Sequence, residues 1–419
     1  MSIICGTDLS SASRGALEVA CALAAQRGDR EVVLVYAIEG ESDDAKLGEH
    51  RAQLEAQARI SDGPGVRIEI VAGPPDQVLV GLAKTEGADL IIVAARSRAD
   101  RDGARLGTTA ASVIARTHVP VIVVRDPAPW LAFAHGDAPL KILLGIDDSP
   151  TCDLGIQWTL ALGKYGPIDV VLGAIYYPDD AAAYYGLPPR ALVESDPEIE
   201  RLMQRDLIRR FTGSSASPPP GVTARARRGL GRIGDHMIEL ADEEKVHAIV
   251  IGTSQKTGLG RLGSVSSVIT QDAHQSVVCV PPQAVVATQT VPVLQQALVA
   301  TDLSQFANRA VPYAFALTQS GGEVHVLHVV KEDAELDEAD LLRHLEALAP
   351  AGATQNLRAH IVRGDDTAET IAQCAARFGV DVICIASHGR SGITRALVGS
   401  VADRLLRVTR LPVLVLRPA

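Results

Sequence analysis

Two features in the last third of the chain are of the kinds that bind a nucleotide. Residues 386–400 read AlaSerHisGlyArgSerGlyIleThrArgAlaLeuValGlySer and lead from an apolar strand to the start of a helix. Backbone N–H groups in such a loop, together with the helix dipole, favour a bound phosphate. Asp302 follows another apolar strand, and its carboxylate can accept hydrogen bonds from a base or a ribose hydroxyl.

Each of these residues also has a purely structural interpretation. Asp302 is a residue type that caps helices, and we expect a helix to follow it over 304–320. Gly389 and Gly399 are suited to turns, because glycine adopts positive φ values without strain. His388 could assist a phosphate or simply be a solvated loop residue. Both interpretations remain open from the residues alone.

The patterns that would indicate other chemistry are missing. The sequence contains neither the GxxxxGK[ST] phosphate loop nor the G-x-S-x-G nucleophile motif. His325 and His328 lie on opposite faces of one expected strand, which places them poorly to share a metal. We therefore predict no catalytic residue and no metal site. Slow ATP hydrolysis needs little beyond positioning and charge, so weak activity of that kind stays compatible with the sequence.

Composition narrows the class of protein further. The 419 residues carry a net charge of −10 and only 3% aromatic residues, which disfavours a nucleic-acid partner. No apolar run approaches the roughly 20 residues of a membrane span, and no targeting pattern opens the chain. The six cysteines form no CxxC pair and suit a reducing compartment. We expect a cytoplasmic protein that does not bind membranes.

The elements that must position these residues occur three times. Each third of the chain opens with an apolar strand that ends at an aspartate, which is Asp8, Asp147 or Asp302. Each third closes with an apolar strand rich in valine. A period of this length has the size of a small domain. The predicted domains are 1–127, 139–284 and 295–419, with links near 126–139 and 281–294.

Within each copy, five apolar strands alternate with helices, which is typical of a parallel, doubly wound α/β sheet. For the strand order 3-2-1-4-5, a ligand is expected between the carboxyl ends of strands one and four. The second copy adds a segment over 177–195 with three tyrosines, interpreted as a surface loop or as a lid or partner surface. Its run ArgAlaArgArg at 225–228 protects a sheet edge or, at Arg228, binds an anion.

The last third resembles the universal stress protein family, whose members carry a strand-one aspartate and a loop of the form G-x2-G-x9-G-[ST]. Here the loop reads Ala386-x2-Gly389-x9-Gly399-Ser400, and the second strand ends in LeuHisVal at 327–329. The resemblance implies three tandem domains of the adenine nucleotide alpha hydrolase-like fold, and ATP, with or without Mg²⁺, as the ligand. It assigns the base and ribose end to Thr301, Asp302 and Val329, and the phosphate end to Ser387, His388, Gly389, Gly399, Ser400 and Val401.

The other two copies depart from this loop. The second reads Gly252-x2-Gln255-x7-Gly263-Ser264, which is two residues shorter and lacks the middle glycine. The first reads Ala95-x2-Arg98-x8-Gly107-Thr108 and departs furthest. Nucleotide binding is therefore expected in the third copy alone.

Three functions remain after this comparison. The first is an ATP-binding stress-response protein that acts by binding and switching. The second is a nucleotide-free scaffold for protein interaction, and a weaker third is an enzyme acting on adenylated substrates. Because family members pair through strand five, we expect two copies to pair within the chain. The odd copy would then form a homodimer through its own strand-five edge.

Overall fold

The structure is a computed structural model that describes residues 2–40, 44–59, 64–96, 106–189, 195–213, 218–255, 264–284, 293–386 and 399–417. This part of the chain divides into two compact units. Unit 1 comprises residues 1–175 and 218–289, and unit 2 comprises residues 176–217 and 290–419. No helix within the described ranges is both long enough and apolar enough to cross a membrane.

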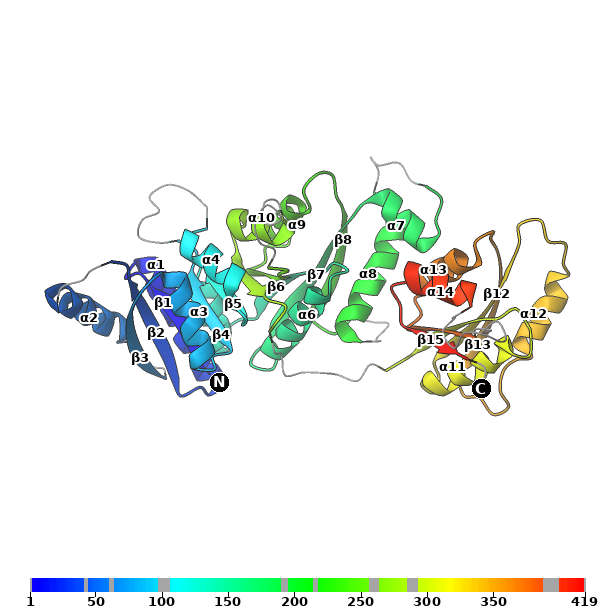
Figure 1. Cartoon of the computed structure of the whole chain (residues 1–419), viewed down its shortest axis with the longest axis horizontal. Coiled ribbons are helices and arrows are strands. Elements are labelled where there is room, and N and C mark those ends of the chain that lie inside the picture. Colours follow the sequence, from blue (N-terminus) through cyan, green and yellow to red (C-terminus); the bar gives the residue numbers. More distant parts are fainter. Residues whose placement is uncertain are drawn as a thin grey trace, which may run out of the picture. The chain divides into compact units, whose positions relative to one another are not determined.

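The first copy alternates strand and helix as its periodicity predicts (Figure 1). Its strands are β1 (Ile3–Thr7), β2 (Glu31–Ile38), β3 (Gly65–Ala72), β4 (Leu90–Ala94) and β5 (Val121–Val124). Its helices are α1 (Ser11–Arg27), α2 (Asp44–Ala58), α3 (Pro75–Thr85) and α4 (Thr108–Arg116). Short apolar runs become strands here because both faces of a parallel sheet are covered by helices.

The second copy repeats this order with one addition. Its strands are β6 (Leu140–Gly145), β7 (Ile168–Tyr176), β8 (Val222–Arg228), β9 (Ala248–Gly252) and β10 (Ser276–Val280). Its helices are α6 (Pro150–Leu162), α7 (Pro178–Tyr185), α8 (Pro197–Thr212), α9 (Ile233–Glu243) and α10 (Val265–Asp272). The additional helix α7 lies in the tyrosine-bearing segment.

The third copy makes a sheet of its own. Its strands are β11 (Gln296–Ala300), β12 (Glu323–Val330), β13 (Asn356–Arg363), β14 (Val382–Ala386) and β15 (Val413–Leu416). Its helices are the 3-10 turn η2 (Ala307–Arg309), α11 (Ala310–Leu317), α12 (Glu338–Glu346), α13 (Thr367–Phe378) and α14 (Ser400–Val408).

The predicted strand order 3-2-1-4-5 is confirmed in all three copies. The third sheet runs β13-β12-β11-β14-β15, and the first two copies show the same order within a ten-stranded sheet. That larger sheet arises because β5 and β10 pair antiparallel, with Val123 opposite Val277 and Val121 opposite Cys279. The expected pairing of two copies through strand five is thus present within unit 1.

Helices cover both faces of each sheet. In unit 1, apolar side chains of α3, α4, α9 and α10 form one continuous cluster against the ten strands. In the third copy, α13 and α14 cover one face, and α11 and α12 cover the other. The crevice beyond the carboxyl ends of the strands is therefore framed by helices that begin or end there.

The link near 126–139 contains a helix, α5 (Ala128–His135), whose Trp130 and Phe133 are fully buried. One expected helix boundary was wrong. The helix expected over 304–320 begins later, at Ala310, after the 3-10 turn. Pro312 has no N–H to donate to the preceding turn, which accounts for this delayed start.

Candidate functional site

The end of β11 is built around Thr301 and Asp302. Thr301 is buried, and its hydroxyl accepts the N–H of Leu303 at 2.9 Å and bonds Asn308 Oδ1 at 2.7 Å. Asp302 is exposed, and its Oδ1 accepts the N–H of Ser304 at 2.9 Å. The carboxylate therefore closes a local turn after the carboxyl end of β11 and stays exposed. Ser304, whose Oγ accepts the N–H of Ala307, takes the capping role considered for Asp302.

The backbone of this turn is strained in the same way in two copies. Leu303 has φ of 64°, and Leu9, which follows Asp8 in the first copy, has the same value. Non-glycine residues rarely adopt this left-handed conformation, and such positions concentrate at functional sites. In the second copy, Asp147 also accepts the N–H of the residue two positions on, Ser149, and accepts the hydroxyl of Ser149 as well.

The neighbouring strand β12 supplies His328 and Val329 at the same edge. His328 Nδ1 lies 2.8 Å from the carbonyl oxygen of Thr301, so this nitrogen carries the proton and donates to it. Val329 is half-buried and packs against the cluster beneath α13 and α14. An apolar side chain thus lies close to the turn that holds Asp302.

The phosphate end predicted from the sequence is described only in part. Ser387, His388 and Gly389 lie outside the described residues. Gly399 is the N-cap of α14, with φ of −57° and ψ of 152°, and no side chain of its own caps the helix. Ser400 is exposed in the first turn of α14, and Val401 is half-buried against the core.

The first loop position is a glycine in the second copy and an alanine in the third, and packing explains each residue differently. A Cβ atom added at Gly252 would lie 2.4 Å from the carbonyl oxygen of Thr151, so packing alone requires glycine there. Ala386 occupies the equivalent place in the third copy, and its methyl group packs with Leu303 against the cluster beneath α11. The alanine that replaces the first loop glycine is therefore accommodated by the core.

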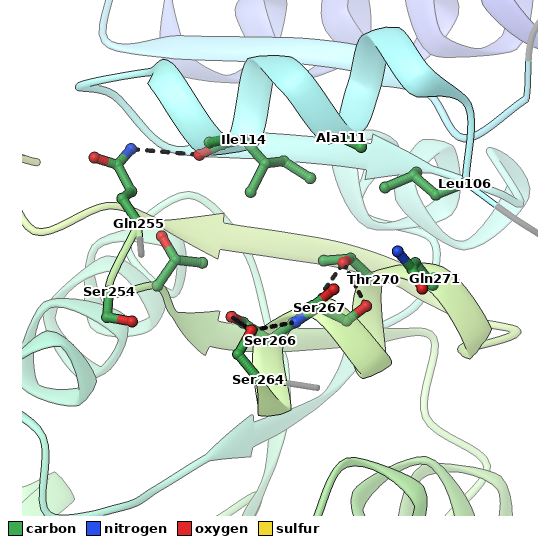
Figure 2. Close-up of a pocket in the computed structure, with 12 residues that line it drawn as sticks. Leu106, Ala111, Ile114, Ser254, Gln255, Ser264, Ser266, Ser267, Thr270 and Gln271 are labelled. Atoms are coloured by element: carbon green, nitrogen blue, oxygen red, sulfur yellow. Dashed lines mark hydrogen bonds between the residues drawn. The ribbon is translucent and has the colours of Figure 1, made fainter. Parts of the chain in front are cut away.

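The second copy uses its shortened loop to contact the first copy. Gln255 retains a positive φ of 48°, and its side-chain amide donates to the carbonyl oxygens of Ile114 and Thr117 at the end of α4. Figure 2 shows this side chain reaching α4, where a dashed line marks its bond to Ile114. Side chains of α4 and α10 line a small open groove beside it. The N-terminus of α10 is capped by its own Ser264, whose Oγ accepts the N–H of Ser267.

The two histidines of β12 have separate environments, as their opposite faces predict. His325 is buried, and its Nδ1 lies 3.0 Å from Nε2 of His360 on β13. Both rings stack on Phe378 at the end of α13, with centroid distances of 5.0 and 4.3 Å. Burial, and then the neighbouring His360, lowers the pKa of His325 to about 4. The sequence analysis did not predict this pair, because His360 is distant in the chain.

Two arginines of the basic run on β8 and the cysteines have structural roles, and the anion site considered at Arg228 stays a prediction. On β8, Arg225 pairs with Glu244 at 2.6 Å, and Arg227 pairs with Glu239 and Glu243 at 2.9 and 2.8 Å, consistent with charge along a sheet edge. All six cysteines are buried, and none forms a disulfide. Among the described residues, no group of three potential metal ligands comes together.

Comparison with known proteins places these features in a family. A profile described as the Universal stress protein family matches residues 1–125, 140–281 and 294–417. Universal stress protein Rv2005c of Mycobacterium tuberculosis is 29% identical over 202 residues, which are 43% of this chain and 64% of that protein. Universal stress protein G of Shigella flexneri is 31% identical over 129 residues, which are 27% of this chain and 90% of that protein.

One solved structure is similar to part of the chain. The universal stress protein from Archaeoglobus fulgidus is 16% identical, with a TM-score of 0.48, over 67% of this chain and 98% of that chain. The chain thus spans a little under two thirds of the mycobacterial relative and nearly all of the shorter relatives that it matches.

Proposed function

Because the chain belongs to the universal stress protein family, we propose that its third copy binds an adenine nucleotide, ATP with or without Mg²⁺, and acts as a stress-response switch. One observation carries this proposal. β11 and β14 are adjacent parallel strands, with Ala300 opposite Ile385, so Asp302 and the start of the glycine loop lie at one edge of the sheet. That edge is where ligands bind in open α/β sheets.

The described residues suit the two ends of such a ligand. Asp302 offers an exposed carboxylate held by the N–H of Ser304, suited to a base or a ribose hydroxyl. Val329 supplies an apolar surface for the base. At the other end, the first turn of α14 begins at Gly399 and Ser400, where backbone N–H groups and the helix dipole favour phosphate. The proposal adds Thr301 to the ribose end, and Ser387, His388, Gly389 and Val401 to the phosphate end.

Calorimetry of the full chain with ATP and Mg²⁺ tests this proposal. Gly399→Asp places a carboxylate at the phosphate end, while aspartate remains a favourable N-cap residue, so the helix is kept. We expect at least a tenfold loss of affinity, since the like charge faces the phosphates. Gly107→Asp, at the equivalent N-cap of α4, is the matched control and should leave binding unchanged. Absence of heat with the wild-type chain would contradict the proposal.

A nucleotide-free scaffold is the second candidate, and one contact favours it. Gln255 joins the second copy to the first through the loop that would otherwise hold phosphate. If all three loops serve contacts of this kind, the wild-type chain gives no calorimetric signal and carries no nucleotide through purification. Nucleotide released by heating the purified protein would count against the scaffold.

We also propose that a second chain pairs with β15. The strands β5 and β10, which pair with each other, are buried along their length, whereas all four residues of β15 are only half-buried. Leu406 on α14 is 49% exposed. Counted from the closing Gly-Ser or Gly-Thr pair, Leu406 corresponds to Ile114 and Thr270, both buried beside the groove in unit 1. Within the described part of the chain, β15 has a strand on one side only. The third copy therefore exposes the surface through which the other two copies associate.

Oligomeric state tests this second part of the proposal. Leu406 is 49% exposed, so burying the rest of its side chain in both chains contributes about 1 kcal/mol at each symmetric position. We expect light scattering to show a dimer for the wild-type chain and a monomer for Leu406→Asp. Leu317→Asp changes a leucine that is 42% exposed on α11 and should leave the dimer intact. A wild-type monomer at micromolar concentration would refute the pairing.

A further inference from the structure

The helices α7 and α8, here named the arm, belong to the second copy by sequence and to unit 2 by packing. They lie between β7 and β8 in the chain, yet they group with the third copy. Figure 1 shows α7 beside α13. Tyr185 of α7 and Leu202 of α8 form a buried cluster with Ala376 of α13. A Cβ atom at Gly186 would lie 2.9 Å from Cβ of Gln373, so the backbones approach closely.

Two arginines of α8 bind the carboxyl end of α13. Arg205 donates to the carbonyl oxygens of Ala376 and Arg377 at 2.6 and 2.8 Å, and Arg209 donates to that of Gly379. The last carbonyls of a helix have no partner within it and lie at the negative end of its dipole. Cationic donors from another element therefore satisfy both requirements of this helix end.

Further contacts fix these arginines in place. Arg205 is held by Asp206, which also accepts the hydroxyl of Tyr185 at 2.8 Å. Arg209 pairs at 2.8 Å with Asp381, whose side chain is only 7% exposed. Asp381 also accepts the N–H groups of Gln295 and Gln296, both at 2.7 Å. The arm thus reaches the start of β11 and β14, the two strands that lead into the candidate site.

The opposite end of α13 is tied to α14. Asp366, the N-cap of α13, accepts the N–H of Glu369 and pairs with Arg404 of α14. Along their length the two helices share a core cluster that includes Ile371 and Leu405. The helix α13 therefore contacts the arm at its carboxyl end and packs along its length on α14. The first turn of α14 is the proposed phosphate end of the site.

We propose that the arm is an internal docking partner of the third copy, and that docking of the arm and binding of nucleotide favour each other. The coupling rests on the proposed nucleotide site, whereas the docking does not. The arm restrains α13, and α13 restrains α14, so a phosphate that binds the first turn of α14 meets a helix already fixed in position. Less ordering is then left for the ligand to impose. By linkage, bound nucleotide must strengthen docking by the same factor.

Hydrogen exchange of the full chain without nucleotide tests the docking. Arg205→Ala combined with Arg209→Ala removes the donors to α13, and Arg201→Ala changes an exposed arginine of the same helix as the control. We expect faster exchange of backbone amides over 367–386 in the double variant, with the Arg201→Ala protein matching the wild type. Unchanged exchange in the double variant would overturn the docking.

A disulfide gives a second, independent readout. In the Gly186→Cys, Gln373→Cys chain the two Cβ atoms start 2.9 Å apart, closer than the roughly 3.5–4.5 Å of a relaxed disulfide, so the backbone at residue 186 must shift slightly before the bond closes. The six native cysteines are buried. We expect this bond to form with Arg205 and Arg209 present, and more slowly in the double variant. If the disulfide formed at the same rate with and without Arg205 and Arg209, that result would contradict docking of the arm through these arginines.

Calorimetry with ATP and Mg²⁺ then tests the coupling. We expect the Arg205→Ala, Arg209→Ala chain to bind ATP at least about fivefold more weakly than the wild type. Closing the disulfide in that background should restore the affinity. Equal affinities in all three proteins would overturn the coupling while leaving the proposed function intact. A wild-type chain that binds no ATP would remove the proposed function and the coupling together, and hydrogen exchange would still decide the docking.

Discussion

The buried imidazole pair of the third copy makes acid stability a sharp test of the packing described above. His325 faces His360 and Arg358 from β13, Glu323 from its own strand at 3.8 Å, and Phe378 from α13. Burial lowers the pKa of His325 to about 4, whereas an unfolded histidine titrates near 6.5. The folded state therefore disfavours the proton. The titration of His325 therefore leaves the free energy of unfolding unchanged above about pH 6.5 and lowers it as the pH drops from there toward 4.

The magnitude follows from these two values. At about pH 5 the unfolded histidine is almost fully protonated and the folded one is largely neutral, which costs the folded state about 2 kcal/mol relative to pH 8. His325→Phe keeps an aromatic ring against Phe378 and removes the titrating group. We expect the difference in unfolding free energy between pH 8 and pH 5 to shrink by about 2 kcal/mol in this variant.

Urea titrations at both pH values measure this difference. Both tryptophans of the chain, Trp130 and Trp158, lie in unit 1, so their fluorescence reports that unit alone. Circular dichroism reports both units, and the transition without a fluorescence change belongs to unit 2. His344→Phe alters an exposed histidine of α12 and should leave the pH dependence of unit 2 as in the wild type. The same acid sensitivity in the His325→Phe and wild-type proteins would refute the reasoning.

Three further predictions concern unit 1 and the thiols. Gln255→Ala leaves two α4 carbonyls without their amide donor, so we expect tryptophan-monitored urea unfolding to show a loss of about 1–2 kcal/mol, against little change for the exposed Gln271→Ala. Gly252→Ala brings a methyl group against Thr151 and should cost about 1–3 kcal/mol in the same assay, whereas Gly81→Ala, with open space around it, should be neutral or gain up to about 1 kcal/mol. Burial raises the pKa of Cys279 and Cys384 to about 12, so no thiol should react with Ellman's reagent until urea unfolds the chain; prompt reaction of the native protein would contradict the burial.

The sheet architecture could be predicted from the sequence because its signals are local and repeated three times. Each apolar run is short enough to be a strand, and the strand-end aspartates mark equivalent positions without any distant information. Asp302 illustrates the limit of this reasoning. Its place after β11 was predictable, but the sequence did not show that its carboxylate would bond the N–H of Ser304 in a local turn while Ser304 takes the capping role.

The contacts that could not be predicted join residues far apart in the chain. From the sequence, Gln255 is a glutamine at the position of the middle loop glycine, which predicts a loop that no longer binds phosphate. Its contact with α4 arises only because β5 pairs with β10. The glycine at 252 looked like a retained binding feature, yet the carbonyl of Thr151 accounts for it. The sequence of the arm does not indicate that α13 is its partner. Arg205 and Arg209 cap the end of α13, but in the sequence they cannot be distinguished from arginines on a solvated helix surface.

The antiparallel pairing of β5 with β10 also has a consequence for folding during synthesis, because β5 leaves the ribosome long before β10. About 150 residues separate these two strands, and synthesis at roughly 5–20 residues per second takes on the order of 10–30 s to deliver the second after the first. During that interval the apolar edge of β5 lacks its partner. Among the described strands β15 is made last, so its edge emerges after the other described strands have been synthesised. Newborn chains on one messenger therefore expose matching edges to each other, and a chaperone that shields β5 would favour the join within one chain over one between neighbours.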